Sequence, residues 1–319
     1  MTMRSLVDRA GTLVGLLLVA IVFGILVGPH FFAPANIELM ARQMAIVGMA
    51  SLGMTMVIVA GGIDLSVGSI IALTTVAIAV FLRQDVPPAA AALGGIAAAT
   101  VCGLANGLLI TWLRVVPFIV TLGMMLVVRG AAKGLADERR LEAPTTWLND
   151  LLRSGGGSFA LPSGIWLLVA LALVVAAVLG YTRFGRHIFA IGSNERMARL
   201  CGVPVERRKV AVYALAGTFG GLAGLLQFSK LSVGDPTVAI GLELDIIAAV
   251  IIGGGSLLGG RGTAAGTLMG AAIMTIISIG CSQKGLPNWV QQIITGAIIV
   301  GAVALDRVRT RSGTGGLGS

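Results

Sequence analysis

The amino-acid sequence predicts an all-α protein, a polytopic bundle of about ten transmembrane helices. Of its 319 residues, 56% are hydrophobic and 12% are charged, whereas soluble domains carry about 25% charged residues. Too few polar side chains are present to coat a soluble fold of this length. Glycine occurs 46 times, while aromatic residues make up only 5%, a balance typical of helices that pack closely in lipid.

Apolar runs long enough to cross a bilayer follow one another along the whole chain. A crossing helix needs about 20 apolar residues. We expect spans at roughly 11–28, 39–60, 64–82, 89–112, 116–135, 164–180, 210–229, 241–258, 263–282 and 288–305. The runs lack the two-residue alternation of a membrane barrel, so strands are not expected. We therefore treat residues 1–319 as a single transmembrane domain.

The first apolar run resembles a cleaved signal sequence in its position. It is long for the apolar core of such a sequence, and Gly28-Pro29-His30 lacks the small-x-small pattern of a cleavage site. We expect the run to be retained as the first span.

Loop charge predicts how the spans are oriented. Segment 181–209 carries seven basic residues against Glu195 and Glu206, so the positive-inside rule places it in the cytoplasm. The tail repeats the basic signal with three arginines at 307–311. Six spans precede the loop and ten precede the tail, so both termini are expected on the cytoplasmic side as well.

Two further segments are expected outside the spans. The loop at about 131–163 has four basic and four acidic residues and should be external, either as a solvated connector or as a docking surface for an external partner. The glycine-rich tail 312–319 is expected to be flexible.

The ten spans divide into two sets of five. An odd number of spans per set inverts the second set relative to the first, an arrangement common in transporters. Gly61-Gly62 interrupts the first set, and Gly253-Gly254-Gly255 interrupts the second. The sequence therefore predicts an inverted repeat of two five-helix halves.

Polar residues near the first interruption are candidates for a pathway or gate. Asp64 and Ser66 lie between two spans with almost no loop, where a carboxylate is costly unless it is paired, capped or solvated. Either residue can cap the next helix, and a place at a helix break beside the conduction path is compatible with that role. Asn106 lies well inside a span, and we expect it to form a hydrogen bond to another helix.

Glu243 and Asp245 are the corresponding candidates near the second interruption. Uninterrupted apolar sequence runs only from Ile246 to Ile252, which is too short to span, so this helix is expected to break or re-enter. The two carboxylates suit the start of a helix, and a role in the pathway is the alternative.

Motifs of other functional classes are missing from the sequence. The positive charge of +9 lies between apolar runs, so we do not expect nucleic-acid binding. No phosphate loop, H-E-x-x-H or G-x-S-x-G motif occurs. The isolated His30 and His187 and the three scattered cysteines give no metal-ligand spacing. We expect no catalytic residues, no metal site and no cofactor on this chain, so transport would need a gradient or a separate motor.

Four segments together resemble the membrane permease subunits of ABC-type sugar importers, the ribose/xylose/galactoside group. They are Thr55–Ser69 (TMVIVAGGIDLSVGS), Gly103–Gly123 (GLANGLLITWLRVVPFIVTLG), Arg183–Val203 (RFGRHIFAIGSNERMARLCGV) and Gly241–Thr263 (GLELDIIAAVIIGGGSLLGGRGT). They occur in the family's order, and the resemblance covers roughly residues 40–305.

The resemblance implies the partners and the location of the protein. It implies a cytoplasmic ATPase that holds ATP and magnesium, a periplasmic sugar-binding protein and a second permease copy, identical or related. The location it implies is the bacterial inner membrane. Transport would occur by alternating access, with no covalent chemistry on this chain.

The resemblance also implies a short coupling helix that docks into the ATPase. Here it maps to about Ser193–Gly202, and the residues that the resemblance assigns to coupling are Asn194, Glu195, Ala198 and Gly202. The local sequence fits a helix, because asparagine caps helix starts and glycine ends helices. Arg196-Met197 departs from the small residues common in the family, which makes the docking face bulkier.

Other functions remain open at this point. The solute could be another small polar molecule, such as a furanosyl autoinducer or a cyclitol. A gradient-driven secondary transporter would need ion-coupling residues, and a membrane-embedded enzyme would need a catalytic constellation; neither is found in the sequence.

Overall fold

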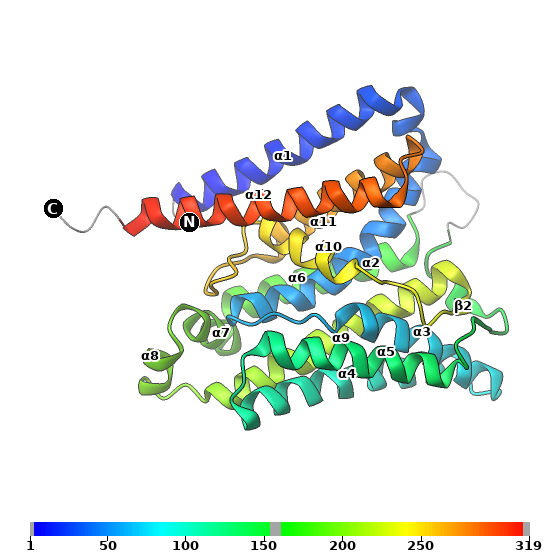
Figure 1. The fold of residues 1–319 in the computed structure, drawn as a ribbon, viewed down its shortest axis with the longest axis horizontal. Coiled ribbons are helices and arrows are strands. Elements are labelled where there is room, and N and C mark those ends of the chain that lie inside the picture. The colour runs from blue at the N-terminus through cyan, green and yellow to red at the C-terminus, as the bar shows by residue number, and fades with distance from the viewer. Residues whose placement is uncertain (1–2, 154–160, 315–319) are drawn as a thin grey trace.

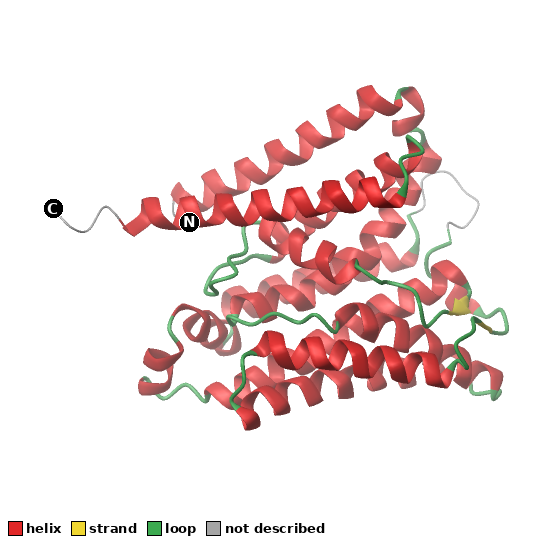
Figure 2. Ribbon diagram, in the orientation of Figure 1, coloured by secondary structure: helices red, strands yellow, loops and turns green. Residues whose placement is uncertain are grey.

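The computed structural model describes residues 3–153 and 161–314 and is almost entirely helical (Figure 1; Figure 2). The first half contains α1 (Met3–Val27), η1 (Pro29–Phe32), α2 (Pro34–Val59), α3 (Val67–Arg83), α4 (Pro88–Leu113) and α5 (Pro117–Leu135). A connecting segment holds β1 (Leu141–Glu142) and η2 (Trp147–Asp150). The second half contains α6 (Ser163–Tyr181), α7 (Arg183–Ser193), α8 (Glu195–Leu200), α9 (Val205–Leu231), β2 (Val233–Gly234), α10 (Leu242–Ile252), α11 (Ala264–Gln283) and α12 (Asn288–Thr314).

The predicted helical membrane class is confirmed, and every predicted apolar run coincides with a helix. Among the described residues, six helices are long and apolar enough to cross a membrane: α2, α4, α5, α6, α9 and α11. Gly11–Val27 and Val67–Arg83 are shorter apolar helices. A total of ten spans therefore remains a prediction.

Several predicted boundaries were wrong. Helix α9 begins at Val205 rather than at 210, because its first turn is charged and an apolar count misses it. The predicted span 241–258 ends early, at Ile252, as the short apolar run indicated. The predicted flexible tail 312–319 overlaps α12, which is helical through Thr314, and its remainder, 315–319, lies outside the described residues.

Two short strands form where none were expected. Leu141 pairs with Gly234 and Glu142 pairs with Val233 in an antiparallel bridge. The bridge joins the α5–α6 connection to the segment that follows α9, at the end of the bundle opposite α7 and α8 (Figure 1).

Helix α9 lies at the centre of the bundle and packs on α2, α3 and α4. Small residues allow this packing. A Cβ atom added to Gly217 of α9 would lie 2.9 Å from the Cα atom of Gly103 in α4, and one added to Gly224 would lie 2.5 Å from the Thr74 side chain in α3. Such close approach favours association of helices in lipid, where the hydrophobic effect does not hold them together.

The bundle has two distinct ends. Helices α7 and α8, the beginning of α1 and the end of α12 lie at one end, whereas β2 lies at the other (Figure 1). The basic segments of the sequence are thus gathered at one end.

Candidate coupling surface and transport pathway

Helix α8 is a short, fully capped helix on the basic loop. The Asn194 side chain accepts a hydrogen bond from the backbone N–H of Met197 at 3.0 Å, which caps its beginning. At its end the backbone N–H groups of Gly202 and Val203 donate to the carbonyls of Arg199 and Ala198, both at 3.0 Å.

Gly202 completes this ending because it has a φ of +79°, a left-handed conformation that glycine adopts without strain. The paired hydrogen bonds and the left-handed glycine form a Schellman motif. The helix that the resemblance implied is therefore present, and Asn194 and Gly202 define its two ends.

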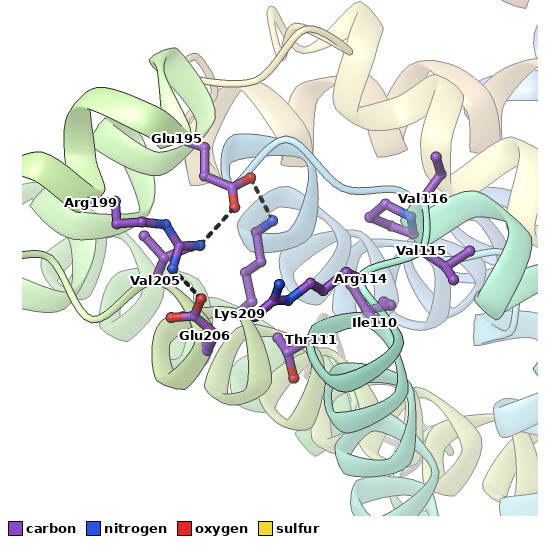
Figure 3. A pocket seen from close by; sticks show the side chains of 11 residues that line it. Ile110, Thr111, Arg114, Val115, Val116, Glu195, Arg199, Val205, Glu206 and Lys209 are labelled. Carbon is purple, nitrogen blue, oxygen red and sulfur yellow. Dashed lines mark hydrogen bonds and ion pairs between the residues drawn. The ribbon is translucent and has the colours of Figure 1, made fainter.

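Ion pairs connect α8 to the beginning of α9. The Glu195 carboxylate accepts from the Lys209 ammonium at 2.7 Å and lies 3.4 Å from the Arg199 guanidinium. Arg199 also pairs with Glu206. Figure 3 shows these ion pairs joining Lys209, Glu195, Arg199 and Glu206 in succession, so the acidic residue at the start of α8 is bound to the next long helix, α9.

The two faces of α8 differ. Ala198 is only 5% exposed and packs with Ile191 and Val205, so it holds α8 against the rest of the chain, and its coupling role stays a prediction. Met197 is 53% exposed and Leu200 is 76% exposed. These two apolar residues were not assigned to coupling from the sequence, although an exposed apolar pair at i and i+3 on a charged helix is a recognisable signal.

A cavity of about 580 Å³ opens beside α8 (Figure 3). One wall comes from 195–209, and the other from residues 110–117, which are the end of α4, the turn after it and the first residue of α5. Arg114 in that turn has a left-handed backbone with φ of +53° and forms no side-chain ion pair with the described residues. The cavity therefore presents a free cation next to the ion pairs of α8.

At the first interruption, the structure brings together three of the predicted pathway residues. The Asp64 carboxylate accepts from the backbone N–H of Ser66 at 2.9 Å and from its hydroxyl at 2.6 Å. The Asn106 side chain donates to the Ser66 hydroxyl at 2.8 Å, which is the predicted bond between helices. All three side chains are buried, so Asp64 and Asn106 form one polar network through Ser66.

The same interruption is also held through a backbone carbonyl. The Ile63 carbonyl accepts from the Thr121 hydroxyl at 3.2 Å and from the Tyr213 hydroxyl at 3.4 Å. Side chains from α4, α5 and α9 thus fix the extended segment between α2 and α3. A buried backbone without helical hydrogen bonds needs such partners.

Glu243 and Asp245 lie in the first turn of α10. The Glu243 carboxylate accepts from the backbone N–H of Gly241 at 3.3 Å and lies against Gly68 in the first turn of α3. Asp245 is half-buried. Both carboxylates therefore lie near the beginning of α3: Asp64 accepts hydrogen bonds from Ser66, and Glu243 lies against Gly68.

Arg129 is a half-buried cation within α5 that sequence reasoning missed. Its guanidinium donates to the carbonyls of Pro236 and Val238 at 2.9 and 2.7 Å and so holds the segment that leads into α10. A basic residue inside an apolar run is itself a signal of a buried partner.

The described residues contain no group of three or more His, Cys, Asp and Glu side chains that could hold a metal. His187 accepts a hydrogen bond from the Arg208 guanidinium at 3.1 Å, which is a structural role. Cys102, Cys201 and Cys281 are free.

Comparisons with known proteins identify the family. Residues 36–303 match the family described as branched-chain amino acid transport system / permease component. The chain is 38% identical over 306 residues to the ribose import permease protein of Bacillus subtilis strain 168, covering 96% of this chain and 95% of that protein. It is 35% identical over 307 residues to the ribose import permease protein of Escherichia coli strain K12, with the same coverage. It is also 35% identical over 303 residues to the fructose import permease protein of Rhizobium meliloti, covering 92% of this chain and 84% of that protein.

The apolar helices together with these relatives define a multi-pass membrane permease. The chain belongs to the family of ABC importer permeases that contains these sugar import permeases. The resemblance found in four sequence segments is thereby confirmed over nearly the full chain.

Proposed function

We propose that this chain is the transmembrane subunit of an ATP-driven importer that conducts a monosaccharide such as ribose across the bacterial inner membrane. Relatives over nearly the whole chain are ribose and fructose import permeases, which supports a sugar as the solute. Another small polar solute, such as a furanosyl autoinducer or a cyclitol, is the alternative. Sugar binding would reside mainly in a separate periplasmic protein, which docks on the external loops near 131–163.

Helix α8 is the observation that carries the ATP-driven mechanism. It is capped at both ends, tied to α9 by ion pairs and exposes Met197 and Leu200. A rigid helix with an exposed apolar pair is suited to fit a groove on a partner. The ATPase, which holds ATP and magnesium, would receive α8 and contact the free Arg114 in the adjacent cavity. Its closure would move α8, and the spans would then open to one side at a time.

The finer architecture belongs to the same proposal. We infer ten spans in two inverted sets of five, with α7, α8 and both termini in the cytoplasm and a second permease copy beside the first. The positions of α8 and of the ends of α1 and α12 at one end of the bundle support this sidedness (Figure 1). Labelling of single cysteines at positions 139 and 196 in intact cells would test it, because only position 139 should react with an impermeant reagent.

Reconstitution with the ATPase and the binding protein tests the function. We expect ribose uptake into vesicles that requires ATP, and the double variant Glu195→Lys with Gly202→Arg should lose uptake while it still inserts in the membrane. Gly180→Arg is the control, because nothing lies within 4 Å of a Cβ atom at that glycine. Uptake without any ATPase would favour a gradient-driven transporter, and undiminished uptake by the double variant would count against the coupling role of α8.

A further inference from the structure

The last turn of α7 lies against both helix interruptions. Gly192, in this turn, is two residues before Asn194, the cap of α8. A Cβ atom on Gly192 would lie 2.5 Å from the backbone nitrogen of Gly260 and 3.0 Å from the carbonyl carbon of Val59. Val59 is the last residue of α2, and Gly260 lies between α10 and α11. One backbone position next to the coupling helix thus contacts both breaks.

The two interruptions are also bonded to each other at this place. The backbone N–H of Gly260 donates to the Val59 carbonyl at 2.9 Å. A Cβ atom added to Gly259 would lie 2.9 Å from the Gly192 Cα atom, and one added to Gly61 would lie 3.6 Å from it. We call Gly61, Gly192, Gly259 and Gly260 the glycine junction.

The close contacts of the glycine junction are between backbones, as they are where Gly217 of α9 meets Gly103 of α4. At Gly192 the neighbouring atoms are backbone atoms, which cannot turn aside as a flexible side chain can. Gly259 and Gly260 have φ values of +86° and +71°, so their own conformation also favours glycine. Gly180, at the end of the preceding helix α6, has nothing within 4 Å of an added Cβ. Gly192 is therefore in tight contact, whereas Gly180 is not.

We propose that Gly192 and Gly260 are positioning residues that pass the movement of α8 to both helix interruptions together. The proposal rests on the proposed coupling role of α8. Close-packed contacts transmit displacement because they have no free space in which to relax. From Val59 the chain leads within five residues to Asp64, so this contact connects the end of α7, next to α8, with the buried polar network, beside the route through the α8–α9 ion pairs and Tyr213.

Gly192→Ala in the reconstituted importer tests the proposal. The added methyl group must separate the end of α7 from Val59 and Gly260. We expect the number of sugar molecules transported per ATP hydrolysed to fall at least about fivefold, the lower range of coupling between sites. Gly180→Ala, the matched control, should keep the wild-type ratio. A merely structural role would lower uptake and hydrolysis together and leave the ratio unchanged.

Ser193→Val is the second variant, because Gly192→Ala could fail to fold. Ser193 is exposed, and its Cα atom lies 3.2 Å from the position of a Cβ on Gly260, so a branched side chain there loosens the same contact from the surface. We expect a smaller fall in the same ratio, with co-purification of the ATPase and the thermal midpoint unchanged.

Two results would overturn the proposal. One is that folded Ser193→Val transports as many sugar molecules per ATP hydrolysed as the wild-type protein does, and that Gly192→Ala, where it folds, does the same. The other is an equal loss in Gly180→Ala. If the wild-type protein itself shows uptake that does not depend on ATP, the proposed function fails. The glycine junction would then have no ATP-driven movement of α8 to transmit.

Discussion

The two helix interruptions of this permease are held in opposite ways. Side chains from α4, α5 and α9 hold the segment between α2 and α3, through hydrogen bonds to Ile63 and Ser66. The segment between α10 and α11 is held by backbone contact, at Gly253 against α11 and at Gly260 against Val59. Hydrogen bonds from side chains of neighbouring helices hold Ile63 and Ser66, whereas close backbone contacts hold Gly253 and Gly260.

This difference has a consequence for transport. A hydrogen bond donated by a side chain can be exchanged for one to water at little net cost. A contact between two backbones cannot be exchanged in this way. The first interruption is therefore suited to change its partners during a cycle, whereas the second is suited to keep them.

Gly266→Val should give the largest effect on stability. A Cβ atom on Gly266 of α11 would overlap the Gly253 carbonyl oxygen, and backbone atoms cannot relax as a side-chain end can. We expect a loss of more than about 3 kcal/mol, the upper range for overpacking, measured as a fall in folded yield and thermal midpoint in detergent. Gly134→Val in α5 is the control, since nothing lies within 4 Å of its Cβ position. Equal losses in both variants would show that helix propensity, not contact, limits α11.

Sequence reasoning could predict the features that depend on local pattern. The apolar runs, the break after Ile252 and the caps at Asn194 and Gly202 each follow from residues close together in the chain. Asn106 was expected to bond to another helix because an amide within an apolar run must find a partner.

Contacts between distant residues could not be predicted in the same way. Nothing in the sequence pairs Gly192 with Val59 or Gly260, because a glycine at a close contact looks the same as one in open space. The burial of Ala198 was also hidden, since α8 is too short for its pattern to show which face packs inward. The inward face became clear only from its contacts with Ile191 and Val205.

Asp64→Ala should give an intermediate loss of stability, because it changes only the contacts of the first interruption. The variant leaves the backbone N–H and the hydroxyl of Ser66 without their acceptor, and an unsatisfied buried group costs about 1–3 kcal/mol. Asp64→Asn retains one acceptor oxygen and should lose less. Thermal unfolding in detergent measures both, and a loss in Asp64→Asn as large as in Asp64→Ala would show that charge, not hydrogen bonding, matters at this position.

Substitution of Asp235 should have the smallest effect on stability. Asp235 lies in the segment that leads into α10, whereas the second interruption follows α10. It accepts from Arg140 at 2.9 Å and from the backbone N–H and hydroxyl of Thr237 at 2.8 and 2.7 Å. Burial alone raises the pKa of Asp235, but the Thr237 hydrogen bonds and the Arg140 charge outweigh it and hold the pKa below its usual value of 3.8. The entry to α10 is thus held by a titratable group, whereas its exit at 253–263 contains no carboxylate.

Because the pKa of Asp235 is lower in the folded state than in the unfolded state, its stabilisation is present above the unfolded pKa and is lost as the pH falls through the folded pKa. The gap in thermal midpoint between the wild-type protein and Asp235→Asn should therefore stay constant above the unfolded pKa of about 3.9 and narrow as the pH falls below it. The corresponding difference in the free energy of unfolding should stay below about 1 kcal/mol, since Arg140 is largely exposed and its charge is screened. The deficit of Gly266→Val should not change over the same range, because no carboxylate takes part in the contact that it breaks. A gap for Asp235→Asn that widens in acid would reverse the sign and show that burial dominates at the entry to α10.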